Sequence, residues 1–326
     1  MAEKNKQTSS NTKKKLWIAA GVLVLLAALA ETAATLLLAG PPASDEDWKK
    51  AAEEVRNLFQ ENDLLLFAPE WIDPTGRLHM GDLLDIRQVT RPDEASFDRI
   101  WVVGPRGKTR RETRNARLIS RKRFGSIEAS LYRNRIDPAL FDFYKEISEA
   151  KVEVLNKDGS RAGYCPYKPA IQRHQCEAGW NNVRQKIAEV DYKPRRCVYA
   201  HPVDGRILEI AFPEAIMGSR LVVYTGLDGY DARYRARREV YYTLNPEKRK
   251  GRAPERAGPD KLVDVTMEIL IGDSEPLKLS HPIDDKWRRH VLDTSDATGT
   301  SARVSFRIHT QWAYSKVFCF HAQTRK

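Results

Sequence analysis

Residues 302–309, with the sequence ARVSFRIH, decide the fold class of the C-terminal part of the chain. Val304, Phe306 and Ile308 alternate with polar residues, so an extended backbone would place the apolar side chains on one face and the polar ones on the other. Alternation of this kind is typical of a strand that covers a core with one face and meets solvent with the other. The stretch therefore predicts a half-buried β-strand.

The rest of the C-terminal part contains eight more segments that favour strands, each short and each bounded by Gly, Pro, Asp or Asn residues that favour turns. They lie at 197–200, 206–212, 221–225, 239–243, 263–271, 277–279, 288–292 and 316–321. Many short strands at this spacing are typical of two packed antiparallel sheets. We expect residues 197–326 to form a β-sandwich of the jelly-roll type.

The segment 45–155 has a different pattern, in which apolar runs alternate with helical stretches. Ser44 and Asp47 have the character of a capping box at the start of a helix that extends to residue 62. Strands are predicted at 64–68, 100–103, 127–132 and 152–155, and a second helix at 138–147 with Asp137 as its N-cap. This order predicts a small α/β domain. No glycine-rich phosphate-binding loop follows the apolar strands predicted at 64–68 and 100–103, and we expect no cofactor.

The N-terminal stretch 16–39 is almost entirely apolar and is long enough to cross a bilayer as a helix. Five lysines precede it, and the sequence PPASDEDW follows it. Because lysines stay on the cytoplasmic side, we expect the remainder of the chain to be exported. The protein would then be a single-pass protein of a bacterial inner membrane with a periplasmic C-terminal part. The alternative is a signal peptide cleaved after Ala30, which exports the same part without an anchor.

Glu31 is the one ionisable residue within this apolar stretch. A carboxylate in lipid is costly unless it is paired, so Glu31 is a candidate contact with a helix of a partner subunit. The alternatives are simpler: a position near the outer interface, a protonated carboxyl, or a processing site.

All four cysteines lie in the exported part, where an oxidising compartment favours disulfides. Four cysteines allow three sets of pairings. Cys165 and Cys176 bracket a short loop and are the natural local pair, which leaves Cys197 in the first strand of the sandwich and Cys319 in the last. His174 lies near the local pair, but the spacing matches no zinc finger, and we expect no metal.

The predicted fold class is α+β, with an N-terminal transmembrane helix, a small α/β domain and a C-terminal β-sandwich. The predicted parts are a cytoplasmic tail (1–15), the transmembrane helix (16–39), the small α/β domain (45–155), a connector with the local disulfide (156–196) and the jelly roll (197–326).

The composition is that of an ordinary folded protein, with 41% hydrophobic and 30% charged residues, which argues against wholesale disorder. The net charge of +11 is concentrated in two basic islands, 106–123 and 233–256. The first island has the spacing of a helix that is basic on every side, typical of a segment that is solvated or faces phosphates.

We expect the first island to contact anionic envelope material, such as phospholipid head groups, a lipid-linked sugar phosphate or an acidic polymer. The residues assigned to this contact are Arg110, Arg111, Arg114, Arg117, Arg121, Lys122 and Arg123. Export argues against nucleic acid as a partner. The alternative is a charged connector that keeps the domain soluble.

Two stretches carry a resemblance to a known family. DKWRRHVLDTSDATGTSARVSFRIHT (285–310) resembles the late strands of galactose-binding-like jelly rolls, a fold shared with carbohydrate-binding modules, and RCVYAHPVDGRILEIAF (196–212) resembles their opening strands. DLLLFAPEWIDPTGRLHMGD (63–82), followed by this sandwich, resembles exported regions associated with bacterial integral-membrane glycosyltransferases. The resemblance implies carbohydrate-related binding in the envelope rather than sugar transfer by this chain.

Aromatic residues in two predicted loops of the sandwich make a candidate ligand site. A sugar offers an apolar face to an aromatic ring and hydroxyls to planar polar groups. The residues assigned to this site are Trp312, Tyr314, Tyr230, Tyr234, Arg233, Arg235 and Gln311. The alternative is that the aromatic residues at 312 and 314 cap the end of the core.

Glu70, Asp73, His79 and Asp82 follow the first predicted strand, at the end where α/β proteins place their sites. They offer an acid/base pair or a metal site, but the sequence DPTG is also an ordinary turn. No nucleophile or stabilising group accompanies them, and no catalytic motif is recognised elsewhere.

We therefore assign no catalytic residues and expect a membrane-anchored binding protein that recognises carbohydrate or an anionic envelope polymer. The first alternative is a structural or assembly subunit of an envelope membrane complex. The second is an enzyme that acts on a glycan or lipid-linked sugar through the loop at 70–82.

Overall fold

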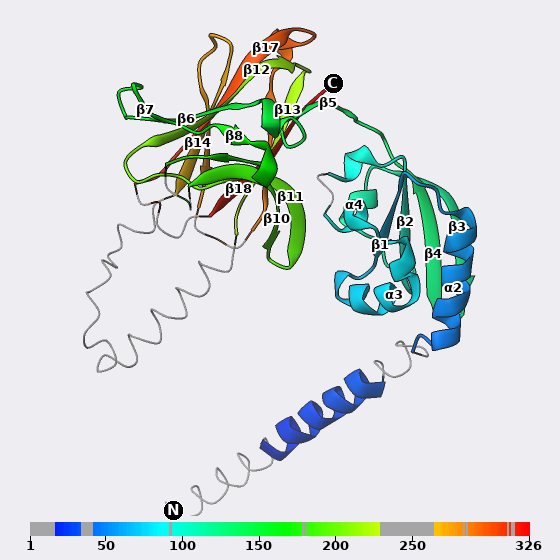
Figure 1. The fold of residues 1–326 in the computed structure, drawn as a ribbon. Helices are drawn as coiled ribbons and strands as arrows, with labels where there is room; N and C mark the ends of the chain where they lie inside the picture. The colour runs from blue at the N-terminus through cyan, green and yellow to red at the C-terminus, as the bar shows by residue number, and fades with distance from the viewer. Residues whose placement is uncertain are drawn as a thin grey trace, which may run out of the picture. The chain divides into compact units, whose positions relative to one another are not determined.

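The structure is a computed structural model that describes residues 17–33, 42–90, 93–177, 179, 181–228, 264–282, 284, 286–311, 313 and 317–326. Two compact units of different architecture are seen in Figure 1. The first unit contains the residues up to 83 together with 99–133, and the second contains 84–98 and 134–326. The sequence-based ranges had grouped 84–98 and 134–155 with the first unit.

The first unit is built on a four-stranded sheet. Its strands, in spatial order, are β1 (Asp63–Phe67), β2 (Arg99–Pro105), β4 (Ile127–Arg133) and β3 (Arg117–Phe124), and only β1 and β2 are parallel. Helix α2 (Asp45–Leu58) packs on β3 and β4, and α3 (Asp73–Met80) packs on α2 and β1. Short 3-10 turns lie at Glu70–Ile72, Gly81–Leu83 and Arg111–Thr113.

The N-terminus of α2 confirms the predicted capping box. The Ser44 hydroxyl accepts a hydrogen bond from the Asp47 amide (3.1 Å), and the Asp47 carboxylate accepts one from the Ser44 amide (3.3 Å). Trp48 and Val55 share the buried face of the helix. The apolar spacing in the sequence thus places this face against the sheet.

The second unit is a β-sandwich of two antiparallel sheets. The eight-stranded sheet contains, in order, β8 (Tyr167–Lys168), β9 (Arg173–Gln175), β10 (Asn182–Val190), β11 (Lys193–Ala200), β18 (Phe318–Arg325), β13 (Arg220–Leu227) and β16 (Arg288–Asp293), with β5 (Ala139–Asp142) also pairing with β18. The six-stranded sheet contains β7 (Arg161–Tyr164), β6 (Lys151–Leu155), β12 (Ile207–Ile216), β17 (Ser301–His309), β14 (Val265–Ile271) and β15 (Leu277–His281). Short helical turns lie at Ile86–Val89 (α4), Glu94–Ser96, Ile147–Glu149, Pro169–Ile171 and Ser295–Ala297.

From β11 onward the chain crosses repeatedly between the two sheets, which confirms the jelly-roll prediction. The apolar faces of both sheets meet in one core. Phe143 packs edge-on against Phe212 and Phe306, with both ring centroids 4.9 Å away. Val304, Phe306 and Ile308 of β17 are all fully buried, as their alternation predicted.

Eight of the nine strands predicted after residue 196 are confirmed within a few residues at each end, and the ninth, at 239–243, lies outside the described residues. The predicted helix at 138–147 is wrong. Its first half is β5, in which Phe141 and Asp142 pair with the end of β18 that β11 does not reach, so pairing outweighs helix propensity. The strand at 152–155 is confirmed, but as β6 it pairs with β12 in the sandwich.

The predicted helix over the basic island 106–123 is also wrong. Residues 117–124 form the edge strand β3, which pairs with β4. The predicted connector at 156–196 is itself strand-rich, since it contains β7 to β10 and the start of β11.

Both predicted disulfides are present. Cys165 and Cys176 are joined with a Cα–Cα distance of 4.2 Å, and the bond closes the β8–β9 hairpin. Cys197 and Cys319 are joined with a Cα–Cα distance of 5.7 Å, and the bond links the neighbouring strands β11 and β18.

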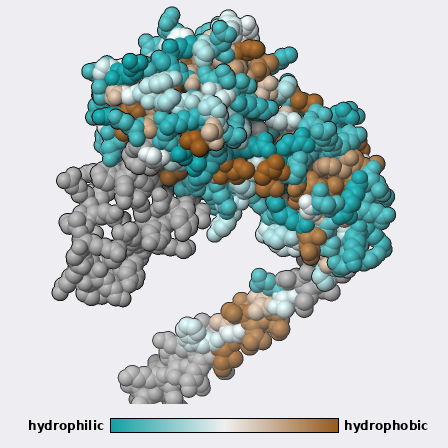
Figure 2. Space-filling model, viewed as in Figure 1, coloured by the Kyte–Doolittle hydropathy of each residue, from teal (hydrophilic) through white to brown (hydrophobic). Residues whose placement is uncertain are grey.

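Residues 17–33 are helical and expose apolar side chains, visible as the brown run along this helix in Figure 2. Among the described residues, no helix combines the length and the apolar character required for a bilayer crossing. The span at 16–39 and the partner contact of Glu31 remain predictions.

Candidate functional site on the outer face of the eight-stranded sheet

The eight-stranded sheet has one face in the sandwich core and one face directed away from it, which we call the outer face. In β18, Phe318, Phe320 and Ala322 belong to the core, so Cys319 and the alternate residues that follow it lie on the outer face. The same alternation and the strand register define the outer-face residues of the neighbouring strands.

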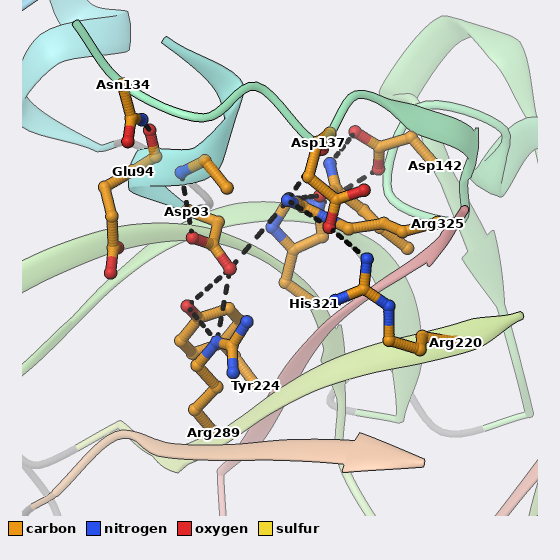
Figure 3. Close-up of polar contacts among 12 residues, drawn as sticks. Asp93, Glu94, Asn134, Asp137, Asp142, Arg220, Tyr224, Arg289, His321 and Arg325 are labelled. Carbon is orange, nitrogen blue, oxygen red and sulfur yellow. Dashed lines mark hydrogen bonds and ion pairs between the residues drawn. The ribbon is translucent and has the colours of Figure 1, made fainter. Parts of the chain in front are cut away.

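A buried polar network occupies one part of the outer face (Figure 3). Asp93 is 2% exposed and accepts hydrogen bonds from the Tyr224 hydroxyl (2.9 Å) and from Arg289 Nε (3.2 Å). A guanidinium nitrogen of the fully buried Arg325 lies 3.9 Å from the same carboxylate. Asp93 therefore holds the segment before β2 against strands β13, β16 and β18.

The network continues through a second carboxylate. Asp142 accepts hydrogen bonds from His321 Nε2 (3.0 Å) and Gln323 Nε2 (2.8 Å). Arg325 donates to Gln323 Oε1 (2.6 Å) and to the Asp137 carbonyl (2.9 Å). These bonds fix residues 137–142 to β18, as Figure 3 shows.

Electrostatics give this network a structural role. Burial raises the pKa of the Asp93 carboxyl, but the Arg325 charge, the Ala95 amide hydrogen bond, the Arg289 charge and the Tyr224 hydrogen bond together hold that pKa below its usual range. Burial, reinforced by the Asp93 charge, raises the pKa of the Tyr224 hydroxyl. At neutral pH the carboxylate is charged and the hydroxyl keeps its proton, so neither group is poised for proton transfer.

The remaining outer face presents cations that lie over tyrosine rings. Arg184 and Lys186 each lie 5.3 Å from the centroid of Tyr199. Arg195 lies 4.3 Å and Arg289 5.9 Å from the centroid of Tyr224. Tyr199 and Tyr224 are only 9% and 5% exposed, so the rings support the cations and the cations form the outer layer.

Trp287 borders this face at the end of β13. Its indole nitrogen donates to the Lys193 carbonyl (2.8 Å), and its ring packs over Gly226, where an added Cβ would lie 2.7 Å from the ring. Gly226 thus makes room for the indole. At the same end of the sheet, Lys186 forms an ion pair with Asp228.

This surface can bind an anion electrostatically and can stack planar groups. The Asp142–His321 pair on this face is buried, with side chains 12% and 3% exposed, so it does not meet a ligand there. Within the described ranges, no three His, Cys, Asp or Glu side chains are grouped so that they could hold a metal ion.

The sequence-based ligand set falls mostly beyond what the structure describes. Trp312, Tyr314, Tyr230, Tyr234, Arg233 and Arg235 lie outside the described residues. Gln311 is exposed in a bend after β17. The chain segments that border these loops are paired, since Leu227 lies opposite Phe318 in the β13–β18 register. This set remains a prediction.

Sequence reasoning missed the cations of the outer face. Their signal was present in the sequence as basic residues at alternate positions, Arg184 and Lys186 in one strand and Lys193 and Arg195 in the next. The interpretation of 156–196 as a connector hid this pattern.

The carboxylate and histidine set of the first unit is divided among separate contacts. Asp82 pairs with Arg56 (2.8 Å), and Asp73 pairs with Arg77. His79 stacks on Trp48 with a centroid distance of 5.7 Å. Glu70 is exposed and lies 3.8 Å from Arg110. These partners account for each side chain without a shared site.

The basic residues assigned to anionic contact are also divided. Arg110 is largely buried and pairs with Glu112 (3.0 Å), which fixes the loop after β2. In β3, Arg121 pairs with Glu128 (3.0 Å) and Lys122 with Glu54 (2.6 Å). The remaining four residues are exposed: Arg111, Arg114, Arg117 and Arg123. Their contact with anionic material remains a prediction.

No protein-family model matches the chain, and a search of curated proteins finds no match. Among solved structures, the chain is similar to TmCBM61 in complex with beta-1,4-galactotriose, with a TM-score of 0.26 and 8% identity over 58% of this chain and 96% of that one. A structure of carbohydrate-binding modules from the beta-sandwich superfamily gives a TM-score of 0.29 and 10% identity, over 62% of this chain and 67% of that one. The family 11 carbohydrate-binding module of the cellulase Lic26A-Cel5E of Clostridium thermocellum gives a TM-score of 0.26 and 8% identity, over 58% of this chain and 92% of that one. With TM-scores this low, the fold assignment rests on the strand order of the second unit.

Proposed function

We propose that the chain is a membrane-anchored, exported binding protein that recognises carbohydrate or an anionic envelope polymer through the outer face of its eight-stranded sheet. The observation that carries this proposal is the layer of cations over Tyr199 and Tyr224. A sheet face whose cations are held on aromatic rings suits an extended ligand that carries negative charges.

The expected location also supports this function. The apolar stretch 16–39 with its preceding lysines predicts an anchor in a bacterial inner membrane and export of the two units. Two disulfides and no free cysteine in the described residues suit an oxidising compartment.

The test uses the full chain, oxidised and purified in a neutral detergent, on an array of neutral and acidic bacterial glycans. The Lys186→Gln, Arg195→Gln variant removes one cation over each tyrosine, and the Trp312→Ala, Tyr314→Ala variant removes the predicted loop aromatics. We expect saturable binding that the first variant weakens. Binding lost only in the second variant would move the site to the loop at 312–316, and binding to nothing on the array would reject the proposal.

A second candidate function, an assembly subunit, is favoured by one observation. The apolar stretch 16–39 contains a single carboxyl group, Glu31, which is costly in lipid without a partner. Detergent extraction from the native host should then co-purify a membrane partner that the Glu31→Gln variant loses. If the Glu31→Gln variant co-purifies the same partner, this argument for an assembly subunit fails and only the binding function remains.

A further inference from the structure

Three cations form a continuous row across three neighbouring strands of the outer face. Lys168 of β8 lies directly opposite Arg173 of β9, and Arg173 lies directly opposite Arg184 of β10. Residues directly opposite in antiparallel strands point to the same face and lie about 5 Å apart. We call Lys168, Arg173 and Arg184 the cationic row.

The row is electrostatically unfavourable in the free protein. Like charges directly opposite each other destabilise a sheet, and no carboxylate among the described residues forms an ion pair with any of the three. The Nε atoms of Arg173 and Arg184 are buried and donate no hydrogen bond to a described residue. These Nε atoms are enclosed by the protein, so an oxyanion would meet the row through the Lys168 ammonium and the terminal guanidinium nitrogens.

The covalent structure holds the row in register. Cys165 lies two residues before β8 and Cys176 immediately follows β9, so their disulfide closes the hairpin that carries Lys168 and Arg173. Gln172, at the turn of this hairpin, has a left-handed backbone conformation with φ of 47°. Two of the three cations are thus fixed on a cross-linked hairpin at the edge of the sheet.

From this geometry we infer that the cationic row binds successive oxyanions of a linear anionic polymer that lies across the strands. The inference rests on the proposed function and names the ligand class for the same face. Strands are spaced about 4.8 Å apart, so one charge per strand matches a polymer with an anionic group on each repeating unit. Arg184 also lies on Tyr199, so the row leads toward the tyrosine-supported cations.

The oxyanions have two possible sources, the carboxylates of a uronic-acid chain and the phosphates of a phosphodiester or polyphosphate chain. The experiment measures binding of the full-length oxidised protein, in neutral detergent, to four probes: polygalacturonate, inorganic polyphosphate, monomeric galacturonate and a neutral linear galactan. The Lys168→Gln, Arg173→Gln, Arg184→Gln variant removes the row. Lys278→Gln is the control, because it removes one exposed cation from β15 in the other sheet.

We expect one of the two polyanions to bind more tightly than the monomer, with an affinity that falls as salt is raised. Removal of the row should weaken this binding about 100-fold, since each charge near an anionic surface contributes about fivefold. The control should change it less than twofold, and an Arg173→Lys, Arg184→Lys variant, which keeps the charges and the fold, should stay close to the native protein.

Each other outcome overturns the inference. Polyanion binding that survives removal of the row would place the site elsewhere on the protein. Equal affinity for monomer and polymer would contradict binding of successive charges. Binding of the neutral galactan alone would overturn the inference and leave the proposed function standing, whereas binding of no probe and no glycan would reject both.

Discussion

Arg173 on β9 and Arg184 on β10 lie directly opposite each other on the outer face, and Lys168 on β8 lies opposite Arg173 on its other side. Three adjacent like charges repel one another and lower the stability of the free protein. Under the proposed function, a ligand that neutralises the row would relieve this repulsion.

The first prediction concerns Arg173→Glu, which replaces the central cation of the row with a carboxylate between two cations. Each new opposite-charge pair should stabilise the sheet by about 0.2–1 kcal/mol, so the free energy of unfolding should rise. Urea denaturation of the full-length protein measures the change. Lys278→Glu is the matched control, because Lys278 already pairs with Glu268 at 3.1 Å and its reversal should lower stability. A fall for Arg173→Glu would contradict an unfavourable row.

A second prediction concerns Asp93, whose carboxylate is buried beside the Arg325 guanidinium at 3.9 Å. Asp93→Asn keeps the shape of the side chain but leaves the fully buried Arg325 without that charge. Breaking a buried pair in this way costs about 3–5 kcal/mol, which urea denaturation should detect. Asp273→Asn, in an exposed turn after β14, should change stability little. An equally small effect at Asp93 would mean that Arg325 is compensated by Asp137 alone.

Much of the architecture could be predicted from local sequence patterns. The alternation at 302–309 predicted β17 because one-sided burial leaves a period of two in any sequence. Ser44 and Asp47 predicted the start of α2 because a capping box depends only on residues within one turn. The cysteine spacing predicted both disulfides. In each case the physical cause acts within the strand, turn or loop that carries the signal.

The register between distant strands could not be predicted from the sequence. The residues at 139–142 have a helical pattern, but the free edge of β18 is available to them, and pairing outweighs propensity. Lys168, Arg173 and Arg184 become a site only through the pairing of three strands, one of them just two residues long. Asp93 contacts Arg325, which lies more than 200 residues later in the chain. No local sequence pattern predicts such long-range contacts.

A third prediction concerns pH and His281. This residue is 1% exposed, its Nδ1 lies 2.8 Å from the Thr225 hydroxyl, and burial lowers its pKa to about 4. Its pKa in the unfolded chain is about 6.5, so between pH 6.5 and 4 the unfolded state binds a proton that the folded state does not. Stability should therefore fall as the pH falls through this window, by up to about 1.4 kcal/mol per pH unit.

The measurement is the free energy of unfolding as a function of pH for the native protein and for His281→Asn. The variant should show a flatter curve between pH 6.5 and 4, because one proton-binding difference has been removed. Val291→Ala, at an exposed position of β16, removes no titratable group and should leave the slope of the native curve unchanged. Identical slopes for the native protein and His281→Asn would show that other groups, such as the partly buried His290, set the acid sensitivity.

The last prediction compares the two disulfides. Cys197 and Cys319 are separated by 122 residues, whereas Cys165 and Cys176 are separated by 11. A cross-link stabilises mainly by restricting the unfolded chain, by about 4.7 kcal/mol for a loop of about 100 residues and about 3 kcal/mol for one of about 15. Cys197→Ser, Cys319→Ser should therefore lower the free energy of unfolding more than Cys165→Ser, Cys176→Ser does. The Cys165–Cys176 bond also holds together the hairpin that carries Lys168 and Arg173. Removal of the Cys165–Cys176 bond should therefore weaken polyanion binding more than removal of the Cys197–Cys319 bond, although it lowers stability less. If removal of the Cys197–Cys319 bond weakens binding more, the bond between β11 and β18 is the one that holds the binding site.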